Sequence, residues 1–327
     1  MEKKRDKIVQ FHKKIWTSLK KFFSYVQNTC DVRKIGTIAL IIVFLVSTVM
    51  VFRQNQNYKN GRESYGAAEQ LSGLQGTQEQ QGVSEEVFSA QSIPLNEENS
   101  QVSLDIVPIE TKEPERMEVW VPAPVYDDPH VEALKETDLA ALREVNEDVI
   151  GWIMIPDTVI NYPLLQGEDN HYYLDYTWDG QENRVGSIFM ESTNNPDLSD
   201  FHTIIYGHNL REKTMFSPIR NYKKQEFWEE HPYVYVVTDA GVYRYEIYSS
   251  YEAGVTSDTY RLGFKEQGKQ VFIDMGLEQS VISTGVTPEI TDRILTLSTC
   301  TGNGHATRWV VQARLKMVTE SSLEESM

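Results

Sequence analysis

The stretch from Ile35 to Phe52 contains eighteen consecutive residues without a charge, and it divides the chain into two unequal parts. A run of this length is long enough for one helix across the hydrocarbon core of a membrane. A secretory signal peptide is the competing interpretation, but it would have a shorter apolar region and a cleavage site of small residues. Because Arg53-Gln-Asn-Gln follows the run instead, the sequence favours an uncleaved, single-pass membrane anchor.

Charge is distributed unevenly on the two sides of this run. Residues 1–52 carry ten Lys/Arg and three Asp/Glu, a net charge of +7, whereas the rest of the chain carries 21 Lys/Arg and 45 Asp/Glu, a net charge of −24. Because basic flanks stay in the cytoplasm, we expect a cytoplasmic N-terminus and an extracellular acidic part. The two cysteines, Cys30 and Cys300, would then lie on opposite sides of the membrane and could not form an intrachain disulfide.

Composition predicts five regions: a basic cytoplasmic tail (1–34), the transmembrane helix (35–52), a polar stretch (53–126), a folded domain (127–319) and a C-terminal tail (320–327). The polar stretch is rich in Gln, Glu, Ser, Asn and Gly, so it cannot bury enough apolar surface to offset the entropy lost on ordering. We therefore predict a flexible extracellular stalk that holds the domain away from the membrane. The folded domain is long enough for one substantial core.

The folded domain is predicted to be mainly β. It opens with a helix, for which Asp128 is a suitable N-cap and Pro129 a suitable first residue. The apolar stripe of this helix is Val131, Leu134, Leu139, Leu142 and Val145. Eight strands are then predicted, over 149–155, 160–166, 186–191, 203–206, 233–238, 242–253, 294–298 and 308–318. Eight strands fit a closed barrel, with helical insertions at 215–230 and 262–279, the second inside a connection suited to covering a substrate.

A cysteine ends one predicted strand and an arginine begins the next. The run Ile294-Leu-Thr-Leu-Ser-Thr-Cys300 is followed eight residues later by Arg308. This spacing allows a thiol and a permanent cation to face one substrate carbonyl, with the guanidinium donating to a developing oxyanion. A lone cysteine in an apolar strand is also often just a small buried hydrophobic residue, and Arg308 could pair with a surface carboxylate. The pattern favours a nucleophile with an oxyanion partner.

A reactive thiol needs a base or a cationic environment, and histidine is the usual helper. His208 follows the hydrophobic run 203–206 through Gly207, a residue that permits an unusual backbone turn. If the strands that lead to His208 and Cys300 are parallel neighbours, both side chains reach the same rim. We therefore favour His208 as the base.

Two other histidines compete for this role. His305 lies between Cys300 and Arg308, but the preceding Gly302-Asn-Gly304 gives a catalytic base poor support. His202 lies one strand length from His208 and is the third option. We expect neither metal nor cofactor, because no Cys-x-x-Cys or His-Glu-x-x-His sequence occurs. The acidic exported part also argues against a nucleic-acid partner.

Taken together, Tyr-Gly-His208, Thr296-Leu-Ser-Thr-Cys300 and Arg308 resemble the motifs of the sortases, the membrane-anchored cysteine transpeptidases of Gram-positive bacteria. The resemblance extends over nearly the whole folded domain, from Asn146-Glu-Asp-Val-Ile-Gly-Trp152 to Leu315. It does not include the polar stretch or the basic tail. The implied fold is an eight-stranded sortase-like β-barrel.

Within this family the chain looks most like class B, because of the leading helix, the motif at 146–152 and the helical insertion between 254 and 292. The pilin-assembling class usually adds a second hydrophobic segment, and none follows Thr319 here. Class A commonly has a longer spacing between its cysteine and arginine and binds calcium near the last long loop. In this chain Glu266, Asp274 and Glu278 are too scattered to predict a calcium site.

The resemblance implies that Cys300 attacks the carbonyl of a threonine in the C-terminal sorting signal of a surface protein and forms a thioester. An amine of peptidoglycan or of another protein would resolve the thioester. His208 would protonate the leaving amine and deprotonate the incoming one, while Arg308 would hold the substrate carbonyl. Ser298 and Thr299 match motif positions that line the substrate cleft. Class B likeness also implies a signal that begins with Asn-Pro or a close variant.

Two alternative functions are compatible with the same residues. A hydrolytic cysteine peptidase would use Cys300 and His208 with water as the acceptor. A non-catalytic cell-surface module would use the barrel to present a binding face.

Overall fold

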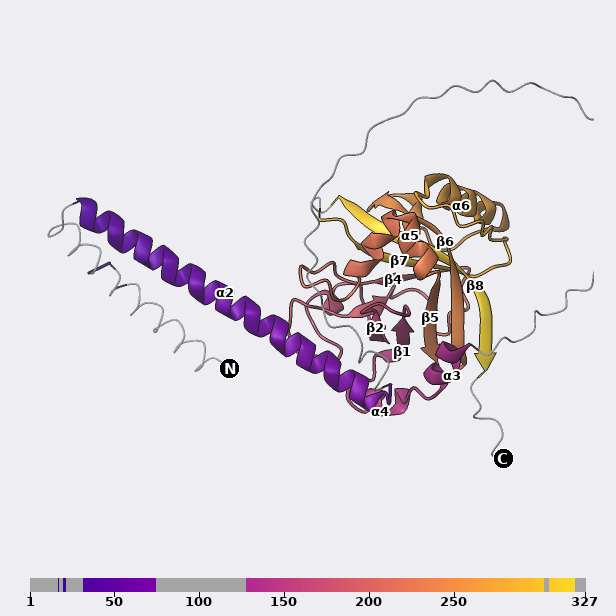
Figure 1. The fold of residues 1–327 in the computed structure, drawn as a ribbon, viewed down its shortest axis with the longest axis horizontal. Coiled ribbons are helices and arrows are strands. Elements are labelled where there is room, and N and C mark those ends of the chain that lie inside the picture. Colours follow the sequence, from indigo (N-terminus) through magenta and orange to yellow (C-terminus); the bar gives the residue numbers. More distant parts are fainter. Residues whose placement is uncertain (1–16, 18–19, 22–31, 75–127, 303–305, 321–327) are drawn as a thin grey trace, which may run out of the picture.

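The structure, a computed structural model, describes residues 17, 20–21, 32–74, 128–302 and 306–320. Its centre is a closed barrel with the strand order β1-β2-β3-β4-β7-β8-β6-β5 (Figure 1), so the predicted eight-stranded barrel is confirmed. The strands are β1 Val149–Met154, β2 Asn161–Leu165, β3 Ile188–Met190, β4 His202–Tyr206, β5 Tyr233–Thr238, β6 Gly241–Gly254, β7 Ile294–Cys300 and β8 Thr307–Glu320.

Two of the neighbouring strand pairs are parallel, β2 with β3 and β4 with β7, and the others are antiparallel. β7 is buried at every position except Cys300, and β4 at every position except Tyr206. Such continuous burial requires cover on both faces of the sheet, which explains why these strands read as unbroken apolar runs in the sequence. Their carboxyl ends are the points where each strand leaves the core.

The predicted opening helix is two short helices, α3 Pro129–Lys135 and α4 Leu139–Arg143. Asp128 caps α3 as predicted, by accepting a hydrogen bond from the His130 amide. A second cap causes the break, because the Asp138 side chain accepts from the Ala141 amide and so begins a new helix. Val145, the last residue of the predicted stripe, lies beyond α4 and is exposed.

The two helical insertions are present but shorter than predicted. The first contains η2 Ser217–Lys223 and α5 Gln225–Glu230, and the second contains α6 Glu266–Gln279. A further turn, η3 Asp258–Tyr260, precedes α6 in the same connection. α6 packs its buried Phe272 4.5 Å from the ring of His202, at the start of β4. The helix of the predicted covering element therefore lies at the opposite end of β4 from His208. A further turn, η1 Tyr172–Leu174, lies in the β2–β3 connection.

The longest element is α2, a single helix over Val32–Leu71 (indigo in Figure 1). It contains the predicted transmembrane stretch, its candidate spanning segment has a mean hydropathy of 1.5, and the side chains over 39–52 are exposed. The helix then continues without a break through 53–71. That part was predicted as flexible stalk, and the structure corrects this prediction for 53–71. The end of the membrane span at Phe52 stays a prediction.

The second half of α2 packs against the barrel. Tyr65 and Ala68 of α2 are buried, as are Ser72 and Leu74 directly after it. The amide of Asp138, the N-cap of α4, donates to the Ser72 carbonyl at 3.0 Å. The chain thus contacts the folded domain before residue 75, while the rest of the predicted stalk, 75–126, lies outside the described residues. Residues 75–127, 1–16 and 321–327 lie outside the described residues.

Gly151 in β1 offers a test of the barrel packing. A Cβ atom there would overlap the Val237 carbonyl oxygen of β5, so we expect Gly151→Ala to lower the free energy of unfolding by about 1–3 kcal/mol. Gly254→Ala in β6 is the matched control, because no atom lies within 4 Å of its added Cβ. Denaturant unfolding of the full chain in detergent micelles measures both, and equal effects would contradict the packing argument.

Candidate active site

The site lies where the parallel strands β4 and β7 end at one edge of the barrel. Tyr206, the last residue of β4, lies opposite Ser298 of β7. His208 and Cys300 are each two residues further along, so they lie level with each other. The prediction that these two strands are parallel neighbours is confirmed.

Hydrogen bonds from both neighbours of His208 hold its backbone to β7. The Gly207 carbonyl accepts from the Thr299 hydroxyl at 2.7 Å, and the Gly207 amide donates to the Ser298 carbonyl at 3.2 Å. On the other side, the Asn209 side-chain amide donates to the carbonyl of Cys300 at 2.9 Å. These bonds fix the backbone of the imidazole-bearing residue relative to the thiol-bearing one.

Gly207 is needed for space and not for an unusual turn. It is absent from the positive-φ glycines, which corrects the backbone reason that the sequence suggested. A Cβ atom there would lie 2.5 Å from the Ile188 side chain and 2.7 Å from the Phe216 ring. The glycine lets β4 pass close to both side chains before His208.

The imidazole of His208 is held from the β2–β3 connection. Its Nε2 lies 2.7 Å from the carbonyl oxygen of Leu174, and a carbonyl can only accept, so Nε2 carries the hydrogen. Nδ1 is then the ring nitrogen able to exchange a proton with a substrate. Gly186, at φ +62°, faces the ring so closely that an added Cβ would lie 2.7 Å from Cδ2.

Arg308 lies directly opposite Cys300 in the antiparallel β7–β8 register. Opposed residues in such a pair point to the same face, with Cβ atoms about 4.5–5.5 Å apart. Cys300 is a free cysteine and is partly exposed. The terminal Nη1 of Arg308 donates to the Thr307 carbonyl at 3.0 Å, which holds the guanidinium close to its own strand. A thiol and a fixed cation therefore share one face of the sheet.

Tyr260 of η3 completes this face, and sequence reasoning missed it. Its hydroxyl lies 2.9 Å from the hydroxyl of Ser298. Burial raises the pKa of Tyr260, the nearby Cys300 adds to the rise, and the Ser298 hydrogen bond and Arg308 oppose it. The part of the β6–β7 connection that reaches the site is thus η3, while α6 lies elsewhere. A tyrosine in a turn carries no sequence signal that would have identified it.

Ser298 and Thr299 lie in the site but are almost completely buried. Each is 2% exposed, and their hydroxyls are engaged with Tyr260 and Gly207 respectively. Their predicted role in contacting substrate stays a prediction.

Sequence reasoning also missed a buried carboxylate at the end of β3, which lies on the far side of β4 from Cys300. Glu191 follows β3 and accepts hydrogen bonds from the Tyr206 hydroxyl at 2.9 Å and from Asn170 at 2.7 Å. Burial and this carboxylate raise the pKa of Tyr206. An acidic residue at the end of an apolar strand was a usable signal, because such a residue needs partners when it is buried.

The structure gives different outcomes for the two histidines that competed with His208 as the base. His202 is 2% exposed, and its two ring nitrogens lie 2.8 Å from the Arg261 carbonyl and 2.8 Å from the Thr296 hydroxyl. It is therefore a structural residue in the aromatic cluster under α6. His305 lies outside the described residues.

The chain is similar in sequence to known proteins. The Sortase domain family model matches residues 153–316. The chain is 37% identical over 161 residues to Sortase B of Staphylococcus aureus, which covers 49% of this chain and 66% of that protein. It is 37% identical over 166 residues to Sortase B of Listeria monocytogenes, which covers 50% of this chain and 67% of that protein.

The fold is also similar to a solved structure, the Staphylococcus aureus sortase B-substrate complex. The TM-score is 0.53 at 35% identity, and the match covers 55% of this chain and 85% of that one. The matched region thus spans slightly less than two thirds of the full Staphylococcus aureus protein.

Burial of His202 predicts an acid-sensitive contribution to stability. Burial lowers the pKa of His202 from 6.5 to about 4, so the unfolded chain binds the proton first as the pH falls. The neutral, buried imidazole therefore contributes to the free energy of unfolding above pH 6.5. About 3 kcal/mol of that contribution is lost as the pH falls toward 4. We expect the stability advantage of the wild type over His202→Gln in urea unfolding to shrink between pH 7 and pH 4.5. An equal advantage at both pH values would contradict this reading.

Proposed function

Because the chain belongs to the sortase family, we propose that it is a class B sortase that transfers surface proteins to an amine of the cell wall. The observation that carries the proposal is the placement of His208, Cys300 and Arg308 at one edge of the barrel, on three neighbouring strands or their ends. The proposed substrate is a C-terminal sorting signal beginning with Asn-Pro or a close variant.

The first half-reaction forms an acyl-enzyme. The sulfur of Cys300 attacks the carbonyl carbon of the signal threonine, and the C–N bond of the scissile peptide breaks. His208 takes the thiol proton of Cys300 at Nδ1 and then delivers it to the leaving amine. Arg308 donates hydrogen bonds to the oxyanion that forms in between, which stabilises the transition state more than the ground state.

The second half-reaction releases the thioester. The nitrogen of an incoming amine attacks the same carbonyl carbon, and His208 accepts its proton at Nδ1. The C–S bond then breaks, and His208 returns the proton to the sulfur of Cys300. The acceptor is an amine of peptidoglycan or of a second protein. Water in place of the amine gives the hydrolytic alternative with the same residues.

The apolar half of α2 supports an anchored location for this reaction. We propose that 35–52 spans the cell membrane once, with the basic N-terminus in the cytoplasm and the barrel outside. Substrate proteins that are themselves still held at the membrane would then meet the site on the same surface.

The product of the reaction tests transfer against hydrolysis. We expect the full chain in detergent micelles, given Asn-Pro sorting-signal peptides and a small amine, to yield an amide-linked product in mass spectra. Cys300→Ala should abolish this product, whereas Cys30→Ala should leave it unchanged. Free acid alone under saturating amine would support the hydrolytic alternative, and no processing of any signal peptide by the wild type would support the binding module.

The role of Arg308 is tested by replacing its forked guanidinium while the charge is kept. We expect Arg308→Lys to lower kcat by about 10²-fold or more, the scale for loss of an oxyanion donor. Arg314→Lys is the matched control, since Arg314 lies on the same strand and pairs with Glu246 at 3.0 Å, far along β8 from Cys300. Equal rates for both variants would remove Arg308 from the mechanism.

A further inference from the structure

We propose that Tyr65 of α2 is a positioning residue for His208, so that the helix leading from the membrane holds the imidazole through the β2–β3 connection. The inference builds on the proposed function, because it assigns a role within the same reaction. It concerns a segment that composition alone assigned to a flexible stalk.

The first link is a hydrogen bond between α2 and the end of the β2–β3 connection. The Tyr65 hydroxyl donates to the Gly186 carbonyl at 2.6 Å and lies 3.2 Å from the Ser187 hydroxyl. The phenol is 8% exposed, and burial raises its pKa, so it stays a neutral donor. Its ring also packs edge-on against Tyr162 of β2, with centroids 5.2 Å apart.

The second link runs from this anchored end to His208. The Ser187 amide donates to the Tyr173 carbonyl at 2.8 Å, and the next carbonyl in the chain, that of Leu174, accepts from His208 Nε2. Gly186 itself faces both the His208 ring and the Leu174 carbonyl. Displacement of Gly186 would therefore move the acceptor of the imidazole and one wall of its site together.

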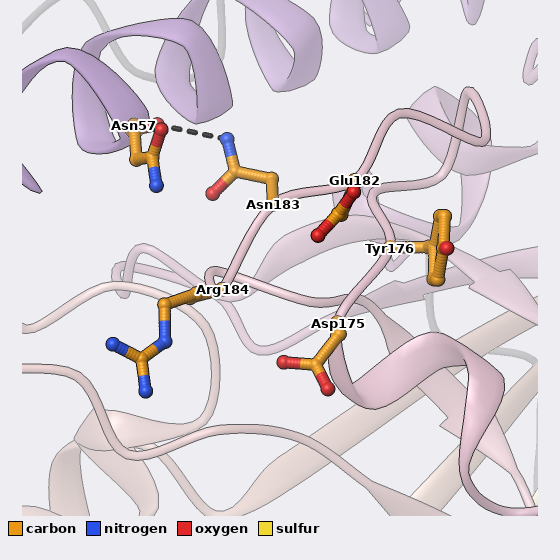
Figure 2. A pocket seen from close by; sticks show the side chains of 6 residues that line it. All are labelled: Asn57, Asp175, Tyr176, Glu182, Asn183 and Arg184. Atoms are coloured by element: carbon orange, nitrogen blue, oxygen red, sulfur yellow. Dashed lines mark hydrogen bonds between the residues drawn. The ribbon is translucent and has the colours of Figure 1, made fainter. Parts of the chain in front are cut away.

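Two more hydrogen bonds fasten the same connection to α2. The Trp178 indole donates to the Ser64 carbonyl at 2.9 Å, and the Asn183 side chain donates to the Asn57 carbonyl at 2.8 Å. Figure 2 shows the second bond at the edge of a polar pocket of about 390 Å³ between the helix and the connection. Asp175, which directly follows Leu174, lines this pocket. The connection is thus held by α2 at several points, and Tyr65 is the one at Gly186.

Small side chains on α2 allow this helix to pack closely against the β2–β3 connection. A Cβ atom at Gly61 would lie 3.0 Å from Val185, and Ala68, one turn beyond Tyr65, is completely buried. Gly61, Tyr65 and Ala68 follow each other at helical spacing and therefore lie on one face of α2. Packing of this face fixes the rotation of the helix and hence the direction of the Tyr65 hydroxyl.

Tyr65→Phe tests the inference, because it removes the hydroxyl and keeps the ring packed against Tyr162. We expect kcat for amide formation by the full chain in detergent micelles to fall about ten-fold with KM unchanged, since a small misplacement of a catalytic group slows chemistry more than binding. Tyr58→Phe on the same helix is the matched control, because its hydroxyl bonds to Gln54 of α2 itself at 3.3 Å. Asn183→Asp, which loses its bond to Asn57, should act in the same direction.

A second readout does not depend on activity. In chain labelled with ¹⁵N-histidine, and with the signal assigned by its loss in His208→Gln, the wild-type ring should show the Nε2–H tautomer. Tyr65→Phe should show a mixture of tautomers, and Tyr58→Phe should match the wild type. Unchanged kcat together with an unchanged tautomer in Tyr65→Phe would overturn the inference, as would equal losses in both tyrosine variants. If the wild type makes no amide product, the proposed function fails, while the tautomer still decides the role of Tyr65.

Discussion

The parallel pairing of β4 with β7 is the contact on which the site depends. It brings residues nearly one hundred positions apart in sequence to the same edge of the barrel, and the register that sets Tyr206 opposite Ser298 also sets His208 level with Cys300. A shift of one residue in this register would turn one of the two side chains to the other face of the sheet. The bonds from Thr299 and Asn209 across this junction oppose such a shift.

The site is supported from one side by strands and from the other by irregular chain. Cys300 and Arg308 sit in a continuous antiparallel ladder, which is a rigid platform for a nucleophile and its oxyanion donor. The imidazole of His208 is held by the β2–β3 connection instead, and that connection has little regular structure beyond η1. A long loop of this kind gains its order from what it packs on, and here it packs on α2.

Much of this arrangement could be predicted from sequence, and the misses have physical reasons. Local sequence patterns predicted the barrel and the placement of His208 beside Cys300. These patterns are the apolar strand runs, the turn residues between them and the short motif around Cys300, and each can be recognised from a few neighbouring residues. The first part of the predicted stalk is helical instead, because α2 beyond Arg53 is polar on its exposed faces and packs partly through Gly61 and Ala68, so its composition resembles an unstructured segment. Tyr260 could not be found, since its role comes from a tertiary contact with Ser298 that no local pattern encodes.

If 35–52 spans the membrane as proposed, the unbroken α2 holds the barrel at a set height above the lipid. The helix rises about 20 Å, at 1.5 Å per residue, from Phe52, where the apolar run ends, to Tyr65, where it contacts the barrel. A helix of that length is stiffer than an unstructured linker, so the barrel edge that carries Cys300 would stay at a nearly constant height above the bilayer. Surface protein and cell-wall acceptor would then both have to reach the site at that height, and lengthening the helix would raise the site away from both.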